Sequence, residues 1–258
     1  MIRQLGWLLL GCALLGLCAC PQHRGIRVPE DQRFTHADKL LAAMAERASE
    51  THSIRAQGVV DMRRKGQRIK AHMLYVSVRP ARLRFETHSF FDQPLSILVL
   101  KDQRFSVWDL NKGRFMRGAA RPENIARMLP VPLAPEAVVS LLMGEPPVIP
   151  FDKAELHWQQ KEGLYLLKLE HGQQREEILV HPKGLHPMEA QATIDGKVFF
   201  SLTYKDWQGP LPRKVEFEMP EEQMKLKLRI KEVEADPELP DSLFELTPPE
   251  GMIIEELE

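Results

Sequence analysis

Alternation of apolar and charged side chains with a period of two constrains the fold of this chain more than any other feature. Residues 224–231 alternate between apolar side chains and lysine or arginine, and residues 81–87 alternate in the same way. Successive side chains of a β-strand point to opposite faces of the sheet, so each segment describes a strand with one buried and one solvated face. The chain is therefore expected to build a sheet that covers one apolar core.

Similar short segments recur along the chain, and tight-turn sequences such as Lys65-Gly66, Glu162-Gly163 and Asp195-Gly196 separate them. The predicted strands are residues 54–63, 67–78, 81–87, 95–100, 103–109, 114–118, 154–159, 164–170, 175–181, 187–194, 197–205, 212–219 and 223–234. This layout indicates one antiparallel sheet of about 11–13 strands, which curls or closes because a sheet of that size does not stay flat.

Three helices are predicted beside the strands. Residues 36–50 place Leu40, Leu41 and Met44 at helical spacing, which describes an amphipathic helix. Two short helices, 122–129 and 135–143, start at prolines, and Gly144 suits the end of the second. Short helices need an apolar surface to pack on. We therefore predict an α+β fold, an open half β-barrel with one N-terminal helix and two short central helices as a lid.

The N-terminal segment is typical of a secretory signal peptide. One cation, Arg3, precedes an apolar run over residues 5–17, which is shorter than the about 20 residues that a membrane-spanning helix needs. The following sequence, residues 17–20, resembles a bacterial lipobox, which implies that Cys20 carries lipid. An uncleaved membrane anchor is the alternative, but no charged flank follows Leu17. We expect a signal peptide over residues 1–19, a lipid-anchored flexible tether over residues 20–34, and one domain over residues 35–258.

Charge and cysteine content exclude several classes of function. The formal net charge of −1 offers no overall attraction for nucleic acid. Removal of residues 1–19 would leave Cys20 as the one cysteine, so we expect neither a disulfide nor a cysteine-based zinc site. No second apolar run approaches membrane-spanning length, and we expect a monomer that contacts the membrane through its lipid.

Support for catalysis is weak. The sequence lacks GxSxG, HExxH, a Walker loop and GxGxxG, so we expect no enzyme activity and no cofactor. His171, His181 and His186 could hold a metal ion only if they converged with a carboxylate such as Glu176. Turn and surface histidines are the favoured interpretation, and we expect no metal.

Two surface features are candidates for contact with a membrane. Phe90 and Phe91 stand side by side in a loop, and two adjacent aromatic residues cannot both face a core behind one strand end. The alternative is a bent loop that buries both phenylalanine side chains under the edge of the sheet. The first hairpin carries a basic cluster over residues 63–70, which could meet anionic headgroups or form an ordinary solvated turn.

Large apolar side chains are expected on the inner face of the sheet. In a half-open barrel some of them would line a cavity for an acyl chain, whereas in a closed barrel they would form an ordinary core. The candidate lining residues are Leu83, Phe85, Ile97, Val99, Phe105, Val107, Trp158, Tyr165, Phe200 and Met224.

The layout resembles the LolA/LolB group of lipoprotein carriers and receptors from residue 35 to the end. The resemblance rests on the strand 80–86, the loop ending Gln93-Pro94-Leu95, the helical piece 129–144 and the tail 243–251. It implies an unclosed barrel that binds lipoprotein acyl chains under helices. In LolB-like receptors an apolar residue on the loop after the third strand hands lipid to the membrane. Phe90 and Phe91 occupy that loop here, where the family usually has an aliphatic residue.

The resemblance implies a lipid-anchored protein at the outer membrane, facing the periplasm, that binds acyl chains and receives or localises lipoproteins. Its expected partners are the membrane, through lipid on Cys20, lipoprotein acyl chains and a periplasmic carrier. The same fold also serves as a sensor domain in envelope-stress regulators, so fold alone does not decide function. An envelope interaction or regulatory lipoprotein without lipid transfer is the alternative, and an envelope hydrolase ranks last.

Overall fold

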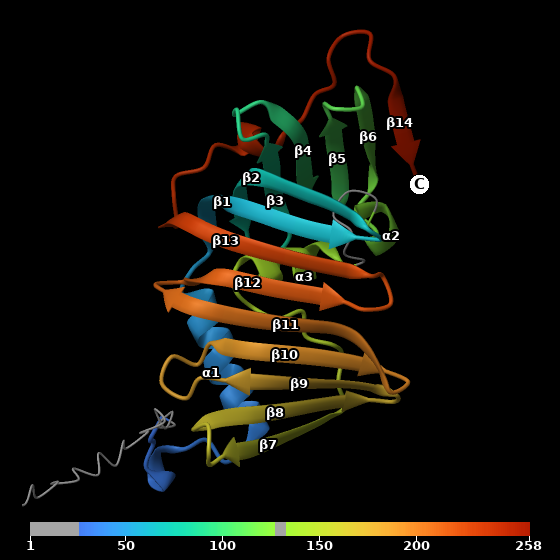
Figure 1. Ribbon diagram of the computed structural model, residues 1–258. Helices are drawn as coiled ribbons and strands as arrows, with labels where there is room; N and C mark the ends of the chain where they lie inside the picture. The colour runs from blue at the N-terminus through green and yellow to red at the C-terminus, as the bar shows by residue number, and fades with distance from the viewer. Residues whose placement is uncertain (1–25, 127–132) are drawn as a thin grey trace, which may run out of the picture.

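One 14-stranded sheet organises the computed structural model, which describes residues 26–126 and 133–258 (Figure 1). The strands are β1 (Ser53–Arg64), β2 (Gln67–Val78), β3 (Arg82–His88), β4 (Pro94–Lys101), β5 (Arg104–Asp109), β6 (Arg114–Ala119), β7 (Lys153–Gln159), β8 (Leu164–His171), β9 (Gln174–Val180), β10 (Pro187–Ile194), β11 (Lys197–Gln208), β12 (Leu211–Met219), β13 (Met224–Ala235) and β14 (Ile254–Leu257). Their order in the sheet is β14-β6-β5-β4-β3-β2-β1-β13-β12-β11-β10-β9-β8-β7. This arrangement confirms the predicted large, curled and unclosed antiparallel sheet.

Two meanders, β1–β6 and β7–β13, join where β1 pairs with β13. The strands at this junction are long, and the β1–β13 register shifts between Gln57 and Gly58. Such a bulge bends a strand and increases its twist, which helps a wide sheet to curl. The sheet ends at β7 on one side and at β14 on the other, so it stays open.

The fourteenth strand was not predicted. β14 pairs with β6 in parallel, whereas all other neighbouring strands of this sheet are antiparallel. Only four residues take part, and no alternation marks them, because their pairing depends on a partner far away in the sequence. Gly118 permits the contact, since a Cβ atom at that position would overlap the carbonyl oxygen of Leu257.

The α-helices of the described residues lie on one face of the sheet, behind the strands as Figure 1 shows them. They are α1 (Ala37–Ser49), α2 (Pro122–Ile125) and α3 (Pro135–Leu142), close to the predicted bounds. The predicted residues 127–129 of the second helix lie outside the described residues. The chain leaves the sheet at β6, passes through α2 and α3, and returns at β7 on the opposite edge. The helices therefore cover the concave face.

The main core fills the space between this face and the helices. Leu40 of α1, Tyr75 of β2 and Val139 of α3 are completely buried within it. The hydroxyl of Tyr75 donates a hydrogen bond of 2.9 Å to the carbonyl oxygen of Leu142, so a polar contact also joins α3 to β2. Burying a large side chain contributes about 1.5–3 kcal/mol, so this face supplies most of the folding energy.

A smaller core lies on the opposite, convex face. Val76, Val78, Val99 and Phe244 are buried there, and the 3-10 helix η2 (Asp241–Phe244) covers them. Ile97 packs against the same cluster. The prediction that Ile97 and Val99 line the inner face is therefore wrong. Residues 95–100 are apolar at both sets of alternate positions, so the pattern alone could not decide which set faces inward.

The segment before α1 packs more closely than the predicted tether. Phe34 stacks edge-on against Tyr165, and its backbone N–H donates a 2.9 Å hydrogen bond to the Tyr165 hydroxyl. The Arg33 guanidinium lies 4.5 Å from the centre of the Trp158 ring. Residues 33–34 are thus held on β7 and β8, which shortens the free part of segment 20–34. Cys20 and the predicted signal peptide lie outside the described residues.

No helix within residues 26–126 and 133–258 is long and apolar enough to cross a membrane.

Substitution of Gly58 by alanine should test the β1–β13 junction. A Cβ atom there would overlap the backbone carbonyl of Arg229, which cannot swing away as a side chain could. We expect the free energy of unfolding to fall by about 2–3 kcal/mol, as in other overpacked sites, measured by urea denaturation. Gly196→Ala is the control. Its added Cβ meets nothing within 4 Å and only its positive φ of 75° is strained, so about 1 kcal/mol should be lost. Equal losses would contradict this account.

Candidate functional site

The inner face of the sheet contains eight of the ten candidate lining residues. Seven are buried in the main core and Trp158 packs against it; the buried ones are Leu83, Phe85, Phe105, Val107, Tyr165, Phe200 and Met224. The helices α1 and α3 contribute Leu40, Met44 and Val139 to the same cluster. Side chains thus occupy the space between sheet and helices. A hydrocarbon chain would enter it only if the helices moved away from the sheet.

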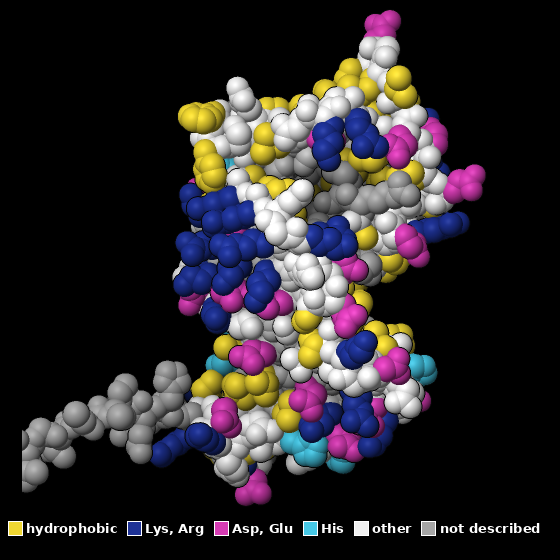
Figure 2. Space-filling view, turned by 45° about the vertical axis from the view of Figure 1, so that its right-hand side comes forward, with side chains coloured by type: hydrophobic (Ala, Val, Ile, Leu, Met, Phe, Trp, Pro, Cys, Tyr) yellow, Lys and Arg dark blue, Asp and Glu magenta, His cyan; other side chains and the backbone are white. Residues whose placement is uncertain are grey.

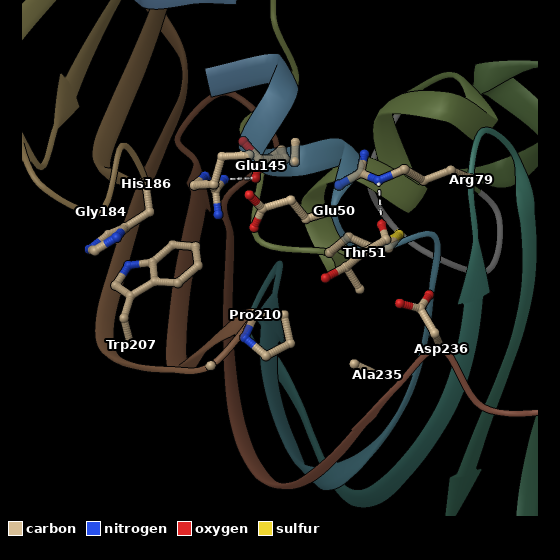
Figure 3. A pocket seen from close by; sticks show the side chains of 14 residues that line it. Glu50, Thr51, Arg79, Glu145, Gly184, His186, Trp207, Pro210, Ala235 and Asp236 are labelled. Atoms are coloured by element: carbon tan, nitrogen blue, oxygen red, sulfur yellow. Dashed lines mark hydrogen bonds and ion pairs between the residues drawn. The ribbon is translucent and has the colours of Figure 1, made fainter. Parts of the chain in front are cut away.

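A pocket of about 500 Å³ opens at the edge of this covered face (Figure 3). It lies where the end of α1, the segment after α3, the end of β2 and three inter-strand segments meet. The lining residues include Arg47, Glu50, Thr51, Arg79, Met143, Glu145, Gly184, His186, Trp207, Pro210 and Asp236. The pocket is rich in charged and aromatic groups, in contrast to the apolar core beside it.

An ion pair between Arg47 and Glu145 crosses the pocket. Both side chains are mostly buried, with 19% and 13% of their surface exposed. Burial raises the pKa of Glu145 to about 7, although Arg47 and Arg79 act in the opposite direction. This pair connects α1 with the segment that follows α3, and both of these helices cover the inner face.

Several hydrogen-bond donors of the pocket are not used. Arg47 Nε and Trp207 Nε1 are buried and have no hydrogen-bond partner among the described residues. Nε of Arg79 donates to the carbonyl oxygen of Thr51 over 3.3 Å, and burial lowers the pKa of the Arg79 guanidinium. Unpaired buried donors cost about 1–3 kcal/mol each, so the wall of this pocket favours a ligand that brings acceptors.

Aromatic rings close one side of the pocket. The rings of His186 and Trp207 lie 4.4 Å apart, and His181 stacks on the other face of His186 at 4.7 Å. Burial, followed by the charges of His181 and Arg47, lowers the pKa of His186 to about 4. His186 is therefore neutral at pH 7 and contributes a flat, uncharged surface.

A second buried carboxylate holds the segment after α3. Glu176 of β9 has no exposed surface, and its Oε2 accepts a 2.9 Å hydrogen bond from the backbone N–H of Ile149. Burial raises the pKa of Glu176 to about 7, and Oε1 has no hydrogen-bond partner among the described residues. Segment 145–150 is thus joined to the rest of the molecule by two carboxylates that are costly to ionise.

The histidines do not converge with this carboxylate. His171 lies 3.5 Å from Asp152 at the surface, whereas Glu176 is buried in the core. Over residues 26–126 and 133–258, no group of three or more His, Cys, Asp or Glu side chains could hold a metal ion.

The loop between β3 and β4 holds its two phenylalanines outward. Phe91 has 89% and Phe90 52% of its surface exposed. The Ser89 hydroxyl accepts hydrogen bonds of 3.2 Å from the backbone N–H groups of Phe91 and Gln93, and Ser89 N–H donates to the Gln93 carbonyl over 2.8 Å. These bonds close the loop on itself, so exposure of the rings follows from the backbone shape.

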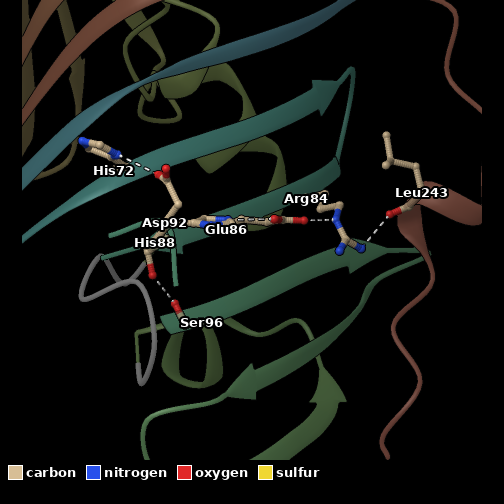
Figure 4. Close-up of polar contacts among 8 residues, drawn as sticks. His72, Arg84, Glu86, His88, Asp92, Ser96 and Leu243 are labelled. Carbon is tan, nitrogen blue, oxygen red and sulfur yellow. Dashed lines mark hydrogen bonds and ion pairs between the residues drawn. The ribbon is translucent and has the colours of Figure 1, made fainter. Parts of the chain in front are cut away.

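Polar side chains of β2 and β3 lie behind the loop (Figure 4). Asp92 lies 3.4 Å from His72 of β2, and Glu86 bridges Arg84 and His88 of its own strand. The loop therefore rests on the convex side of β2 and β3.

The structure brings the aromatic loop and the basic hairpin together, although the sequence showed them as separate features. The ring of Phe90 stacks edge-on against His72 at 4.9 Å, and Lys70 Nζ lies 5.7 Å from its centre. Ile69 beside Lys70 is half exposed. Figure 2 shows a dense group of Lys and Arg side chains on one side of the molecule, with exposed hydrophobic side chains at the corner above it. Apolar tips beside cations are typical of a surface that contacts lipid headgroups.

Sequence reasoning missed the charged pocket. One signal was present, since Arg47 follows Leu40 and Met44 at helical spacing and thus lies on the buried stripe of α1. Glu176 gives a second signal, because it lies on the same inward face of β9 as Ile178 and Val180. A charged residue at a core position indicates a special role, but the partner, Glu145, comes from a distant loop and cannot be identified from spacing.

No known sequence family and no curated protein matches this chain. Solved structures do match its fold. A DUF1329 family protein from Desulfovibrio piger shares 14% identity, with 81% of this chain and 95% of that chain covered and a TM-score of 0.57. A LolA superfamily protein from Nitrosomonas europaea shares 12%, with coverages of 80% and 97% and a TM-score of 0.54.

A third structure is that of a proposed outer membrane lipoprotein-sorting protein domain from Vibrio parahaemolyticus. It shares 11% identity, with 81% of this chain and 97% of that chain covered and a TM-score of 0.58. These similarities confirm, at the level of the fold, the resemblance to the LolA/LolB group.

Replacement of Glu176 by glutamine should stabilise the protein at high pH. The pKa of Glu176 is raised from 4.5 to about 7 in the folded chain, so the folded state binds the proton more tightly than the unfolded state. The free energy of unfolding therefore falls as pH rises from about 4.5 to about 7 and stays low above it. Glu176→Gln removes this loss, so we expect a gain of about 2–3 kcal/mol at pH 8 and under about 1 kcal/mol at pH 5.

Urea denaturation at both pH values measures the difference. Glu177→Gln is the matched control, because the carboxylate of Glu177, the residue after Glu176, is exposed and pairs with Lys168 at the surface. That variant should change little at either pH. A gain for Glu176→Gln that is the same at pH 5 and pH 8 would show that ionisation of this carboxylate is not the cause.

Proposed function

We propose that this protein is a lipid-anchored protein of the bacterial envelope that binds acyl chains between its curled sheet and its helices. It receives or positions lipoproteins at the outer membrane, on the periplasmic side. Lipid on Cys20 anchors it, and a periplasmic carrier delivers the cargo. The observation that carries the proposal is the exposed Phe90–Phe91 loop, closed by its own hydrogen bonds, beside Lys70 on a LolA-type sheet.

The loop would supply the contact with the bilayer. Phe91 has almost no protein contact to lose, and burying a phenylalanine in an apolar phase gains about 1.5–3 kcal/mol. Cations near the bilayer surface add about 1 kcal/mol each with anionic lipids, and the basic hairpin provides several beside Phe90. The loop is already closed by its own hydrogen bonds, so little ordering entropy would oppose insertion.

Acyl-chain binding would use the eight inward residues that pack against the helices. Because side chains fill this space, α1 and α3 would have to separate from the sheet when a chain enters. Short helices such as α2 and α3 depend on their packing, and movement of α3 would also break the Tyr75–Leu142 hydrogen bond.

A second candidate function is supported by the same filled interior. An envelope interaction or regulatory lipoprotein would keep the sheet packed and use its surfaces to dock on another protein. The two candidates differ in one measurable property, which is whether an acyl chain binds at all.

The double variant Phe90→Glu/Phe91→Glu should lose transfer of bound lipoprotein to liposomes. Placing two carboxylates where aromatic rings would enter the bilayer removes the apolar gain and adds repulsion from anionic lipid, so we expect transfer to fall at least about tenfold. Mass spectrometry of the lipoprotein recovered with the protein and with the liposomes gives the ratio. Ile253→Glu is the control, because Ile253 is as exposed as Phe91 but lies beside β14. Unchanged transfer by the double variant would remove the loop from the mechanism.

Lipid attachment at Cys20 has a direct test. Cells that express the full chain and are fed radiolabelled palmitate should label this protein, whereas the Cys20→Ser variant should carry no label. Label that persists in the variant would mean that Cys20 is not the attachment site.

A further inference from the structure

The charged pocket beside α1 has the properties of a binding site for a negatively charged group. Arg47 Nε and Trp207 Nε1 are buried and have no hydrogen-bond partner among the described residues, and the side chains of both residues line a space of about 500 Å³. No hydrogen bond from the terminal nitrogens of Arg79 is present among the described residues, and Figure 3 shows its guanidinium directed toward Glu50 and Thr51. Four or more donor N–H groups without acceptors match the oxygens of a carboxylate or a phosphate.

Acidic side chains also line the pocket, but they do not cancel its preference for a negatively charged group. Asp236 is engaged, because its Oδ1 accepts hydrogen bonds of 2.8 Å from the backbone N–H groups of His52 and Ser53. Glu50 is exposed at the rim, where water screens its charge. Glu145 is the carboxylate buried against a cation, and it already occupies one side of Arg47.

Glu145 occupies the place that a ligand's anionic group would take. Among the described residues its carboxylate pairs with Arg47, and the charge of Arg79 also favours its ionised form, although burial makes that form costly. A ligand anion that reached Arg47 and Arg79 together would interact with two cations, whereas Glu145 pairs with Arg47. Glu145 could then take up a proton. The ion pair that joins α1 to the segment after α3 would be lost at the same step.

The surroundings of the pocket suggest what the anionic group is attached to. Met143, Trp207 and Pro210 provide apolar walls next to the two arginines. Met143 also belongs to the main core under the helices. A head group held by the arginines would therefore leave its hydrocarbon chain at the line where the helices meet the sheet.

From these contacts we infer that the pocket binds the anionic head group, a carboxylate or a phosphate, of an acyl lipid. Arg47 and Arg79 hold the head group, and Glu145 is the resident carboxylate that it displaces. This inference rests on the proposed acyl-chain binding and adds a substrate class and an entry step to it. Displacement of Glu145 breaks the ion pair between α1 and the segment after α3, so recognition of the head group is coupled to opening of the inner face.

Equilibrium dialysis with three radiolabelled twelve-carbon probes tests the inference. The full chain is held in phosphatidylcholine nanodiscs, with empty nanodiscs as the blank, and receives laurate, dodecyl phosphate or uncharged dodecyl maltoside. We expect at least one anionic probe to bind about tenfold more tightly than dodecyl maltoside, and the two anionic probes separate a carboxylate from a phosphate preference. Arg79→Gln should remove this difference, whereas Arg117→Gln should keep it, because Arg117 is an exposed arginine of β6 that pairs with Glu256 of β14.

The Glu145→Gln variant tests whether Glu145 competes with the ligand. If Glu145 had a purely structural role, the pH dependence of laurate binding would be the same in the variant and in the unchanged protein. At pH 8 it should bind laurate about three- to tenfold more tightly than the unchanged protein, because the competing carboxylate is absent. At pH 6 Glu145 is already largely protonated, given its pKa of about 7, so the two proteins should bind alike. Equal affinity for charged and uncharged probes, or no effect of Arg79→Gln, would overturn the inference but leave acyl-chain binding intact. Failure of all three probes to bind would overturn the proposed function as well.

Discussion

An open sheet must hide one apolar face, and this requirement determines most of the structure. A closed barrel covers its interior with its own strands, but this sheet ends at β7 and β14 without meeting itself. The chain instead passes from β6, next to one edge, to β7 at the other edge through α2 and α3, and α1 covers the remainder. The helices are therefore structurally necessary and at the same time separable, because each is joined to the sheet mainly by side-chain packing.

Polar contacts within this packing determine which part of the helical layer is least firmly attached to the rest of the molecule. The Tyr75–Leu142 hydrogen bond is neutral and well buried, so it gives α3 a firm point on β2. The Arg47–Glu145 pair and the Glu176–Ile149 contact instead depend on carboxylates whose burial raises their pKa values to about 7. Buried charges of this kind are weak evidence for stability, since desolvation offsets much of the attraction. The segment after α3 is thus the part of the lid that a change of charge would release first.

Much of the fold could be predicted from alternation and turn chemistry, because both are local. Strands with one solvated face, such as residues 224–231, indicate directly which side chains point to the core. Residues 95–100 are apolar on both faces, and for this reason Ile97 and Val99 were assigned to the inner face although they lie on the convex face. β14 and the packing of residue 34 on Tyr165 depend on distant partners and leave no local pattern. The charged pocket could not be predicted from the sequence for the same reason, since Arg47, Arg79 and Glu145 come together only in the folded, curled sheet.

Strand β2 connects the two surfaces on which the proposals depend. Its first half carries Lys70 and His72 against the Phe90 ring, its middle holds α3 through Tyr75, and the chain just beyond its end places Arg79 in the pocket. Nine residues of strand separate Lys70 from Arg79, which corresponds to about 30 Å. One strand therefore carries both the surface that would meet the bilayer and an arginine that would meet the lipid head group.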